Sequence, residues 1–186
     1  MITRRKTVLG AFSIGGLCLV SSKPACAASA SALVDDSNAA LLKLYKLQPK
    51  SVTLAHAAKG ILVFPSIVKA GFIVGAQSGD GAFYQHGVAT SFYNITAASY
   101  GLQAGIQSFS YALFFMTDKA VNYLSASAGW SIGAGPSVVV LDKGSAASVT
   151  SSTLTQDVYA IPFGQKGLMA GLGLEGSKIT RINPGP

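Results

Sequence analysis

The stretch Phe64–Gly75, FPSIVKAGFIVG, decides how the rest of the sequence is interpreted. Most of its residues are apolar or glycine, and Pro65 and Lys69 interrupt it. Such a run fits a membrane span, a cofactor-binding loop or a pair of buried strands. The apolar region around it, residues 61–76, is shorter than the ~20 residues that a membrane-spanning helix needs, and proline breaks a helix. We therefore predict buried strands here, and no transmembrane span in the mature chain.

The expected strands are short and separated by turn signals. Ile61–Phe64 is predicted to be the first strand, ended by Pro65, and Ala70–Gln77 the second. Ser78–Gly81 (SGDG) predicts a hairpin turn, because glycine adopts positive φ easily and Asp-Gly is typical of hairpins. Further strands are predicted at residues 82–86, 90–96, 100–107, 111–116, 131–141, 147–154, 158–161 and 168–174.

Three segments have the pattern of helices. Residues 33–47 combine an apolar side of leucines with acidic residues near the start and lysines near the end, as the helix dipole favours. Residues 51–59 and 118–126 are the other two. Together these elements predict an α+β fold. It is a single compact domain over residues 33–182, with a mostly antiparallel twisted sheet, an N-terminal helical segment and one mid-chain helix.

The first 27 residues have the pattern of an export signal. Basic residues at positions 4–6 precede a short apolar run at 8–20, and the ACA sequence at 25–27 has the small residues of a cleavage site. We expect cleavage after Ala27, or alternatively after Ala30, and a periplasmic or secreted mature protein. The arginine pair resembles a twin-arginine signal, with the general secretory route as the alternative. An uncleaved anchor and lipid attachment at a cysteine are further alternatives.

Cleavage would change what the composition implies. The whole chain is 49% hydrophobic and 11% charged, with a formal net charge of +7. Loss of four basic residues and no acidic one would leave +3. Both cysteines, Cys18 and Cys26, would also be lost, so we expect no disulfide and no thiolate metal site. A charge of +3 with one arginine, Arg181, disfavours nucleic acid as a partner.

The ionisable residues offer little for catalysis. The chain has two histidines, His56 and His86, and no Gly-x-Ser-x-Gly motif. Two histidines are too few for an ordinary zinc site. Residues 171–176 (GLGLEG) match a dinucleotide-binding pattern but lack the strand and helix context that the pattern needs. We expect no enzyme activity, no cofactor and no metal. Asp80 with His86 is the one local acid–base pair that an enzyme hypothesis would use.

Binding is better supported than catalysis. Five basic residues fall within 27 positions that contain no acidic residue, namely Lys43, Lys46, Lys50, Lys59 and Lys69. Leu41, Leu44 and Leu47 lie between and beside Lys43, Lys46 and Lys50 in the sequence. Such a helix can lie on an anionic membrane with its leucines in the interface and its lysines at the headgroups. The alternative is an ordinary helix with its leucines in the core and solvated lysines outside.

Longer motifs resemble a known family. Residues 58–72 (AKGILVFPSIVKAGF) are similar to the core of the SYLF domain, the Las17-binding protein actin regulator family. Further similar motifs follow in the family's order: GDG at 79–81, FYNI at 92–95, SYGLQAGIQ at 99–107, FMT at 115–117, GW at 129–130, DVY at 157–159 and KGLMAGLGLEGSKI at 166–179. The resemblance covers roughly residues 35–181.

The resemblance implies a binding domain and no enzyme. Eukaryotic members of the family bind phosphoinositide membranes and, in some cases, actin filaments. Their lipid binding is associated with an N-terminal amphipathic helix and a basic surface. For an exported bacterial member, anionic bacterial phospholipids would be the ligand. The lipid-binding residues would then be Lys43, Lys46, Lys50, Lys59 and Lys69 with Leu41, Leu44 and Leu47. The alternative is a structural or protein-interaction domain without lipid binding. Its surface would use Gln103, Gln107, Tyr84, Tyr93 and Tyr100.

Overall fold

The computed structural model describes residues 29–71, 74–100, 105–126, 128–141, 154–166, 174 and 176–185. Its helices and strands are, in chain order, α1 (Ala30–Leu47), α2 (Ser51–Ala57), β1 (Gly60–Gly71), β2 (Val74–Gln85), β3 (Val88–Tyr100), β4 (Gly105–Phe115), α3 (Asp118–Ala126), β5 (Trp130–Ser131), β6 (Val138–Val140), β7 (Val158–Lys166) and β8 (Lys178–Ile182).

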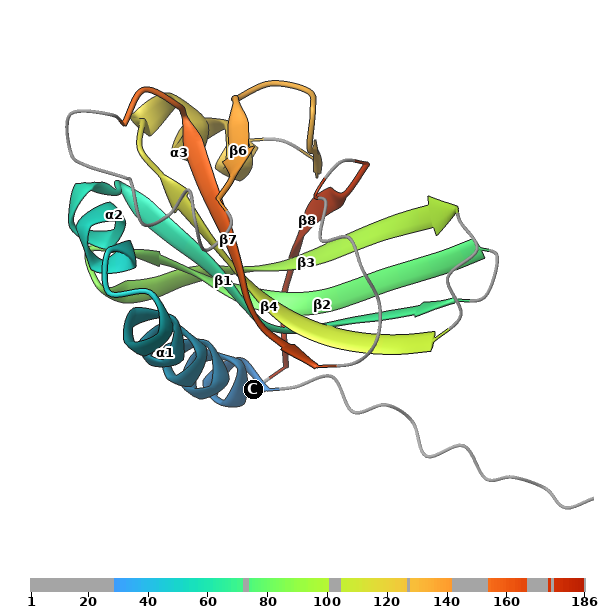
Figure 1. The fold of residues 1–186 in the computed structure, drawn as a ribbon. Helices are drawn as coiled ribbons and strands as arrows, with labels where there is room; N and C mark the ends of the chain where they lie inside the picture. The colour runs from blue at the N-terminus through green and yellow to red at the C-terminus, as the bar shows by residue number, and fades with distance from the viewer. Residues whose placement is uncertain are drawn as a thin grey trace, which may run out of the picture.

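The fold is α+β, as predicted. Within the described residues, the strands form one sheet in the order β5-β8-β3-β2-β1-β4-β7-β6 (Figure 1). Neighbouring strands of this sheet run antiparallel, except that β6 is parallel to β7. Consecutive strands β1, β2 and β3 lie side by side, whereas β4 returns to the other edge of β1. The sheet is therefore built around β1, the strand that contains the FPSIVKAG sequence.

β1 is one long strand that passes through Pro65, so the prediction that Pro65 ends a short strand is wrong. The pairing of β1 with β2 shifts register between Val63 and Val68, and its pairing with β4 shifts at the same place. One extra residue is thus accommodated in β1 as a bulge. A bulge is where a sheet tolerates proline, because the missing N–H group breaks no ladder hydrogen bond there.

The predicted hairpin turn at Ser78–Gly81 is also wrong, because these residues lie in the middle of β2. A Cβ atom on Gly79 would lie 2.5 Å from the carbonyl oxygen of Ser66, and one on Gly81 would lie 2.5 Å from that of Val63. The two glycines therefore allow β2 to approach the bulged part of β1 closely, which is the second common use of glycine in a strand.

The hairpin between β2 and β3 turns at His86 and Gly87. Their φ angles are 52° and 78°, and positive φ at both central residues is typical of a tight two-residue hairpin. The predicted return strand at 82–86 is therefore the second half of β2.

The later strands differ from the prediction in their bounds. Residues 100–107 do not form one strand, because β3 ends at Tyr100 and β4 begins at Gly105, and residues 101–104 lie outside the described residues. The predicted strand at 111–116 is the second half of β4. The helix predicted at 118–126 is confirmed as α3.

The C-terminal half shows the largest departures. The predicted strand at 131–141 is replaced by the two short strands β5 and β6, and β7 continues five residues beyond the predicted 158–161. β8 was not predicted. Residues 147–153 and 168–173, predicted as strands, lie outside the described residues.

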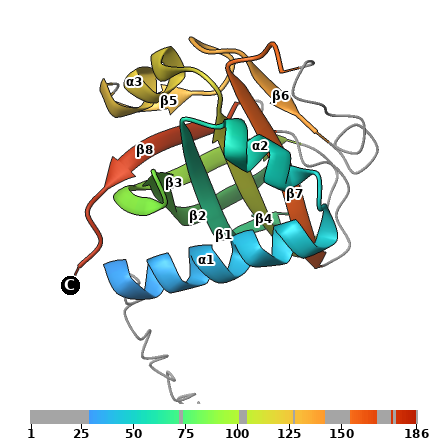
Figure 2. The same ribbon diagram turned by 90° about the vertical axis from the view of Figure 1, so that its left-hand side faces the viewer.

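Each face of the sheet has its own hydrophobic core. On one face, aromatic residues of β2, β3 and β4 pack with α3 and with Trp130 of β5. Phe115 lies at the centre of this cluster, with its ring 5.5 Å from that of Phe83 and 5.9 Å from that of Trp130. On the other face, Leu44 of α1 and Leu54 of α2 pack on the sheet. Figure 2 shows α1 lying across this second face.

None of the described helices is both long and apolar enough to cross a membrane.

Candidate functional site

α1 buries one line of residues and exposes the rest. Leu33, Ser37, Ala40 and Leu44 face the sheet, at the spacing that places residues on one side of a helix. Lys43 and Lys46 are exposed. The side chain of Lys43 extends along the sheet, since its Nζ lies 3.0 Å from the position that a Cβ of Gly164 would take.

The three leucines predicted to contact lipid have different environments. Leu44 is 0% exposed and belongs to the core, so the prediction that it contacts lipid is wrong. Leu41 is half-buried, whereas Leu47 is 51% exposed. Leu42, which was not among the predicted residues, is 61% exposed. Helical spacing carried this information, because Leu42 lies about 200° around the helix from the buried Leu44.

The lysines predicted to bind lipid fall into two groups. Lys50 is exposed in the link between α1 and α2, and Lys59 is exposed just before β1. Lys43 and Lys46 are exposed on α1, and the Nζ of Lys43 lies beside Gly164 of β7. Lys69 is half-buried near the other end of β1, about 30 Å of extended strand from Lys59. The structure therefore separates Lys69 from Lys59, so the five lysines do not form one cluster.

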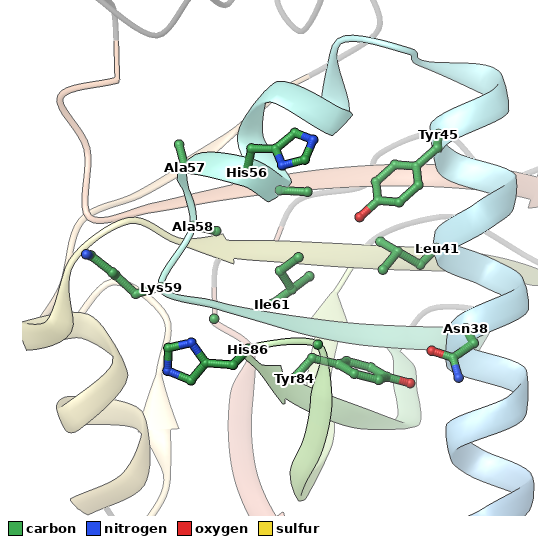
Figure 3. A pocket seen from close by; sticks show the side chains of 13 residues that line it. Asn38, Leu41, Tyr45, His56, Ala57, Ala58, Lys59, Ile61, Tyr84 and His86 are labelled. Carbon is green, nitrogen blue, oxygen red and sulfur yellow. The ribbon is translucent and has the colours of Figure 1, made fainter.

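A pocket of about 470 Å³ lies between α1, α2, the start of β1 and the β2–β3 turn. Its apolar walls come from Leu41, Ile61, Ala55, Ala58 and the rings of Tyr45 and Tyr84. Its polar side chains are those of Asn38, His56, Lys59 and His86. Figure 3 shows Tyr45 and Leu41 reaching in from α1, while Lys59 and His86 point outward together at the opposite side.

Two tyrosines of this pocket stay neutral over the physiological pH range. Burial raises the pKa of Tyr45 above its ordinary value. Burial also raises the pKa of Tyr84; the charge of Asp35 adds to this and contact with Ser37 opposes it. The Tyr84 hydroxyl donates a hydrogen bond to the carbonyl oxygen of Val34 at 3.1 Å, which joins β2 to α1. The tyrosines are therefore part of the scaffold of the pocket.

The acid–base pair considered for catalysis is not assembled. Asp80 lies within β2 and its Oδ1 accepts a hydrogen bond from Asn94 at 2.6 Å. His86 lies six residues further along, in the turn, which is about 20 Å of extended chain away. Within the described ranges, no three His, Cys, Asp or Glu side chains gather in a way that could hold a metal ion.

The surface proposed for a protein partner is not formed as expected. Gln107, Tyr93 and Tyr84 are 1%, 1% and 7% exposed. The alternation in the sequence identified two faces of the strand, and the face with Gln107 turns out to point into the curled sheet. Gln103 lies outside the described residues, as does the side chain of Tyr100.

Comparison with known proteins supports the resemblance seen in the motifs. Residues 96–183 match the family model Ysc84, described as Las17-binding protein actin regulator. No curated protein matches the chain. The matched segment begins in β3 and includes β4, α3 and the strands β5 to β8. Residues 96–183 therefore match the SYLF (Ysc84) domain family, described as Las17-binding protein actin regulator, as the motifs predicted.

Proposed function

We propose that this protein is a non-enzymatic module that binds anionic phospholipid surfaces through its α1–α2 end. The observation that carries the proposal is the exposed half of α1, where Leu42 and Leu47 stand beside Lys43 and Lys46. Exposed leucines next to lysines are the arrangement by which a helix attaches to an anionic membrane surface.

The expected binding is weak and sensitive to salt. Lys43 and Lys46 on α1, Lys50 in the link to α2 and Lys59 before β1 are exposed, and each lysine near an anionic surface contributes about 1 kcal/mol. Asp35 and Asp36 lie nearer the other end of α1. An anionic surface would repel them, which favours approach by the C-terminal half of the helix. Salt weakens the contribution of the lysines and leaves that of Leu42 and Leu47 largely unchanged.

Co-sedimentation of the purified protein with vesicles tests the proposal. Binding to vesicles with anionic lipid is expected, with loss at high salt and none to zwitterionic vesicles. Replacing Lys43, Lys46 and Lys50 by glutamine should lower the affinity by roughly a hundredfold at low salt. The matched control replaces Lys119, Lys166 and Arg181, which are exposed elsewhere, and removes the same charge. Equal losses in the two triple variants would contradict a site at α1.

The leucines are tested separately. Leu42→Ser with Leu47→Ser should weaken vesicle binding and leave the unfolding transition unchanged, because both side chains are exposed. If this variant bound vesicles as tightly as the unmodified protein, insertion of α1 into the membrane would be contradicted.

A second candidate is the protein binding that the family's description names. β1 to β4 extend beyond α1 (Figure 1), and there a row of exposed side chains crosses four strands: Ile106, Ala70, Ala76 and Ala98 are consecutive partners. Ile106 is 74% exposed. Co-sedimentation with actin filaments, compared with an Ile106→Asp variant, tests this candidate. Filament binding that Ile106→Asp abolishes would favour it.

We also propose that the protein is exported and cleaved after Ala27. Cleavage there retains Ser29, whose hydroxyl accepts a hydrogen bond from the amide of Ala32 at 3.3 Å as the N-cap of α1. The alternative cleavage after Ala30 would remove this cap. N-terminal sequencing of the protein recovered from cells would distinguish the two positions.

A further inference from the structure

Both histidines of the chain line the same pocket. His56 and His86 are thirty residues apart in the sequence, and the chain has no others. His56 comes from α2 and His86 from the β2–β3 turn, yet both line the pocket between α1 and the sheet, and Lys59 lines it too (Figure 3). All three side chains are exposed to solvent and therefore accessible to a ligand.

We propose that this pocket binds the phosphate group of an anionic lipid, and that protonation of His56 and His86 strengthens the binding. The inference rests on the proposed function and names the ligand group and its regulation. Lys59 and the two imidazoles supply N–H donors at the rim. Leu41, Ile61 and the ring of Tyr45 supply an apolar wall next to them. A rim of cations beside an apolar wall fits a ligand with an anionic head and an apolar tail.

Among the described residues, the lining of the pocket presents no negative charge that would repel an anionic ligand. The lining groups from α1 are Asn38 and Tyr45, and Tyr84 faces the pocket from β2. Both tyrosines are neutral below pH 10, because burial raises the pKa of each. Asp35 of α1 acts on Tyr84, and no carboxylate is among the described residues that line the pocket. Between about pH 5 and 8, imidazoles are the lining groups that change charge.

Vesicles of phosphatidylglycerol provide the first test, because their phosphodiester keeps its single negative charge over this pH range. Affinity should rise by roughly fivefold for each imidazolium on going from about pH 7.5 to 5.5. His56→Gln with His86→Gln should lose the rise, measured as the ratio of the variant's own affinities at the two pH values. Substituting Lys43, Lys46 and Lys50 by glutamine serves as the control, which should lower the affinity at both pH values and keep the rise.

Inorganic phosphate provides a second readout that does not need a membrane. NMR titration of the imidazole signals of the full protein should show that phosphate, compared with chloride at equal ionic strength, raises the titration midpoints of His56 and His86. Reciprocal linkage requires this if protonation favours phosphate binding. Unchanged midpoints would overturn the pocket as a phosphate site.

The outcomes separate the two proposals. Vesicle binding without a histidine-dependent rise overturns the pocket inference and leaves the proposed function standing. A phosphate effect on the histidines without vesicle binding overturns the proposed function and the lipid source, and identifies a site for a free phosphate compound. A pH-dependent rise that survives the double histidine substitution overturns the role of the histidines.

Discussion

Gly81 shows how a single residue in this fold is constrained by the neighbouring strand. It lies within β2, beside the bulge that Pro65 occupies in β1. A Cβ atom at this position would lie 2.5 Å from the Val63 carbonyl oxygen and 2.6 Å from the ring of Phe64. The backbone of β1 cannot retreat easily, because β4 holds its other edge. The glycine is therefore required by close packing.

Gly81→Ala is expected to destabilise the fold by about 1–3 kcal/mol, the usual cost of adding a methyl group to a packed site. Urea denaturation would measure the free energy of unfolding. Gly185→Ala is the matched control, because a Cβ atom there would have no neighbour within 4 Å. If the Gly81→Ala variant were as stable as the control, β2 would have to shift away from β1 at little cost.

Asp157 joins three elements of the C-terminal half. Its Oδ1 accepts a hydrogen bond from Thr117 at 3.0 Å, and Thr117 in turn caps α3 by accepting from the amide of Ala120 at 3.2 Å. Its Oδ2 accepts from the backbone N–H of Ser137, at 3.1 Å, just before β6. The start of β7 is thus tied to α3 and β6, and the backbone donor from Ser137, followed by the Thr117 hydroxyl, lowers the pKa of Asp157.

Asp157→Asn should lower stability at neutral pH by about 1 kcal/mol, since an amide cannot accept both sets of hydrogen bonds and the site is well solvated. Because the folded pKa is lower than the unfolded one, near 3.9, the contribution is complete well above that value and is lost as pH falls through the folded pKa. Unfolding free energies of both proteins, measured from neutral to acidic pH, should therefore converge in acid. A difference that persists unchanged into acid would contradict this account.

At the scale of the molecule, the first helix and the last strand of the described fold lie close to each other. β8 pairs with β3 on one side and with β5 on the other, and buries Ile179 in the core. The amide of Ala30, at the start of α1, donates to the carbonyl oxygen of Gly185 at 3.0 Å. Figure 2 shows the C-terminal segment ending beside the first turn of α1. The N-terminal helix and the last strand therefore meet across the molecule.

Truncation after Ser177 removes β8 and leaves the edge of β3 unpaired along residues 92–96. We expect a loss of at least about 2 kcal/mol of stability from the missing Ile179 contacts, and self-association through the exposed edge. Denaturation and light scattering would measure the two effects. Truncation after Ile182 is the control, because it keeps β8 and removes only the hydrogen bond that Ala30 donates to Gly185. Equal behaviour of the two truncations would show that β8 is dispensable.

Local patterns were sufficient for the features that depend on neighbouring residues in the chain. The helix at 118–126 begins after a threonine that caps it, and α1 was predicted from the leucines at 33, 41 and 44, of which Leu33 and Leu44 are buried. The α+β class and the family motifs were equally predictable, because they rest on periodicity and on residue order. The positions of the lysines on the exposed part of α1 also follow from that helical spacing.

Contacts between distant segments account for what could not be predicted. Pro65 is compatible with a strand because both neighbours of β1 pair with it around a bulge. Gly79 and Gly81 were predicted to form a turn, because the local sequence does not show that β1 passes close to them. Gln107 is buried because the sheet curls over it. His56 and His86 line one pocket because the fold brings α2 and the β2–β3 turn, thirty residues apart in the sequence, to its two sides. Each of these depends on cross-strand distances, which a periodicity along one segment does not contain.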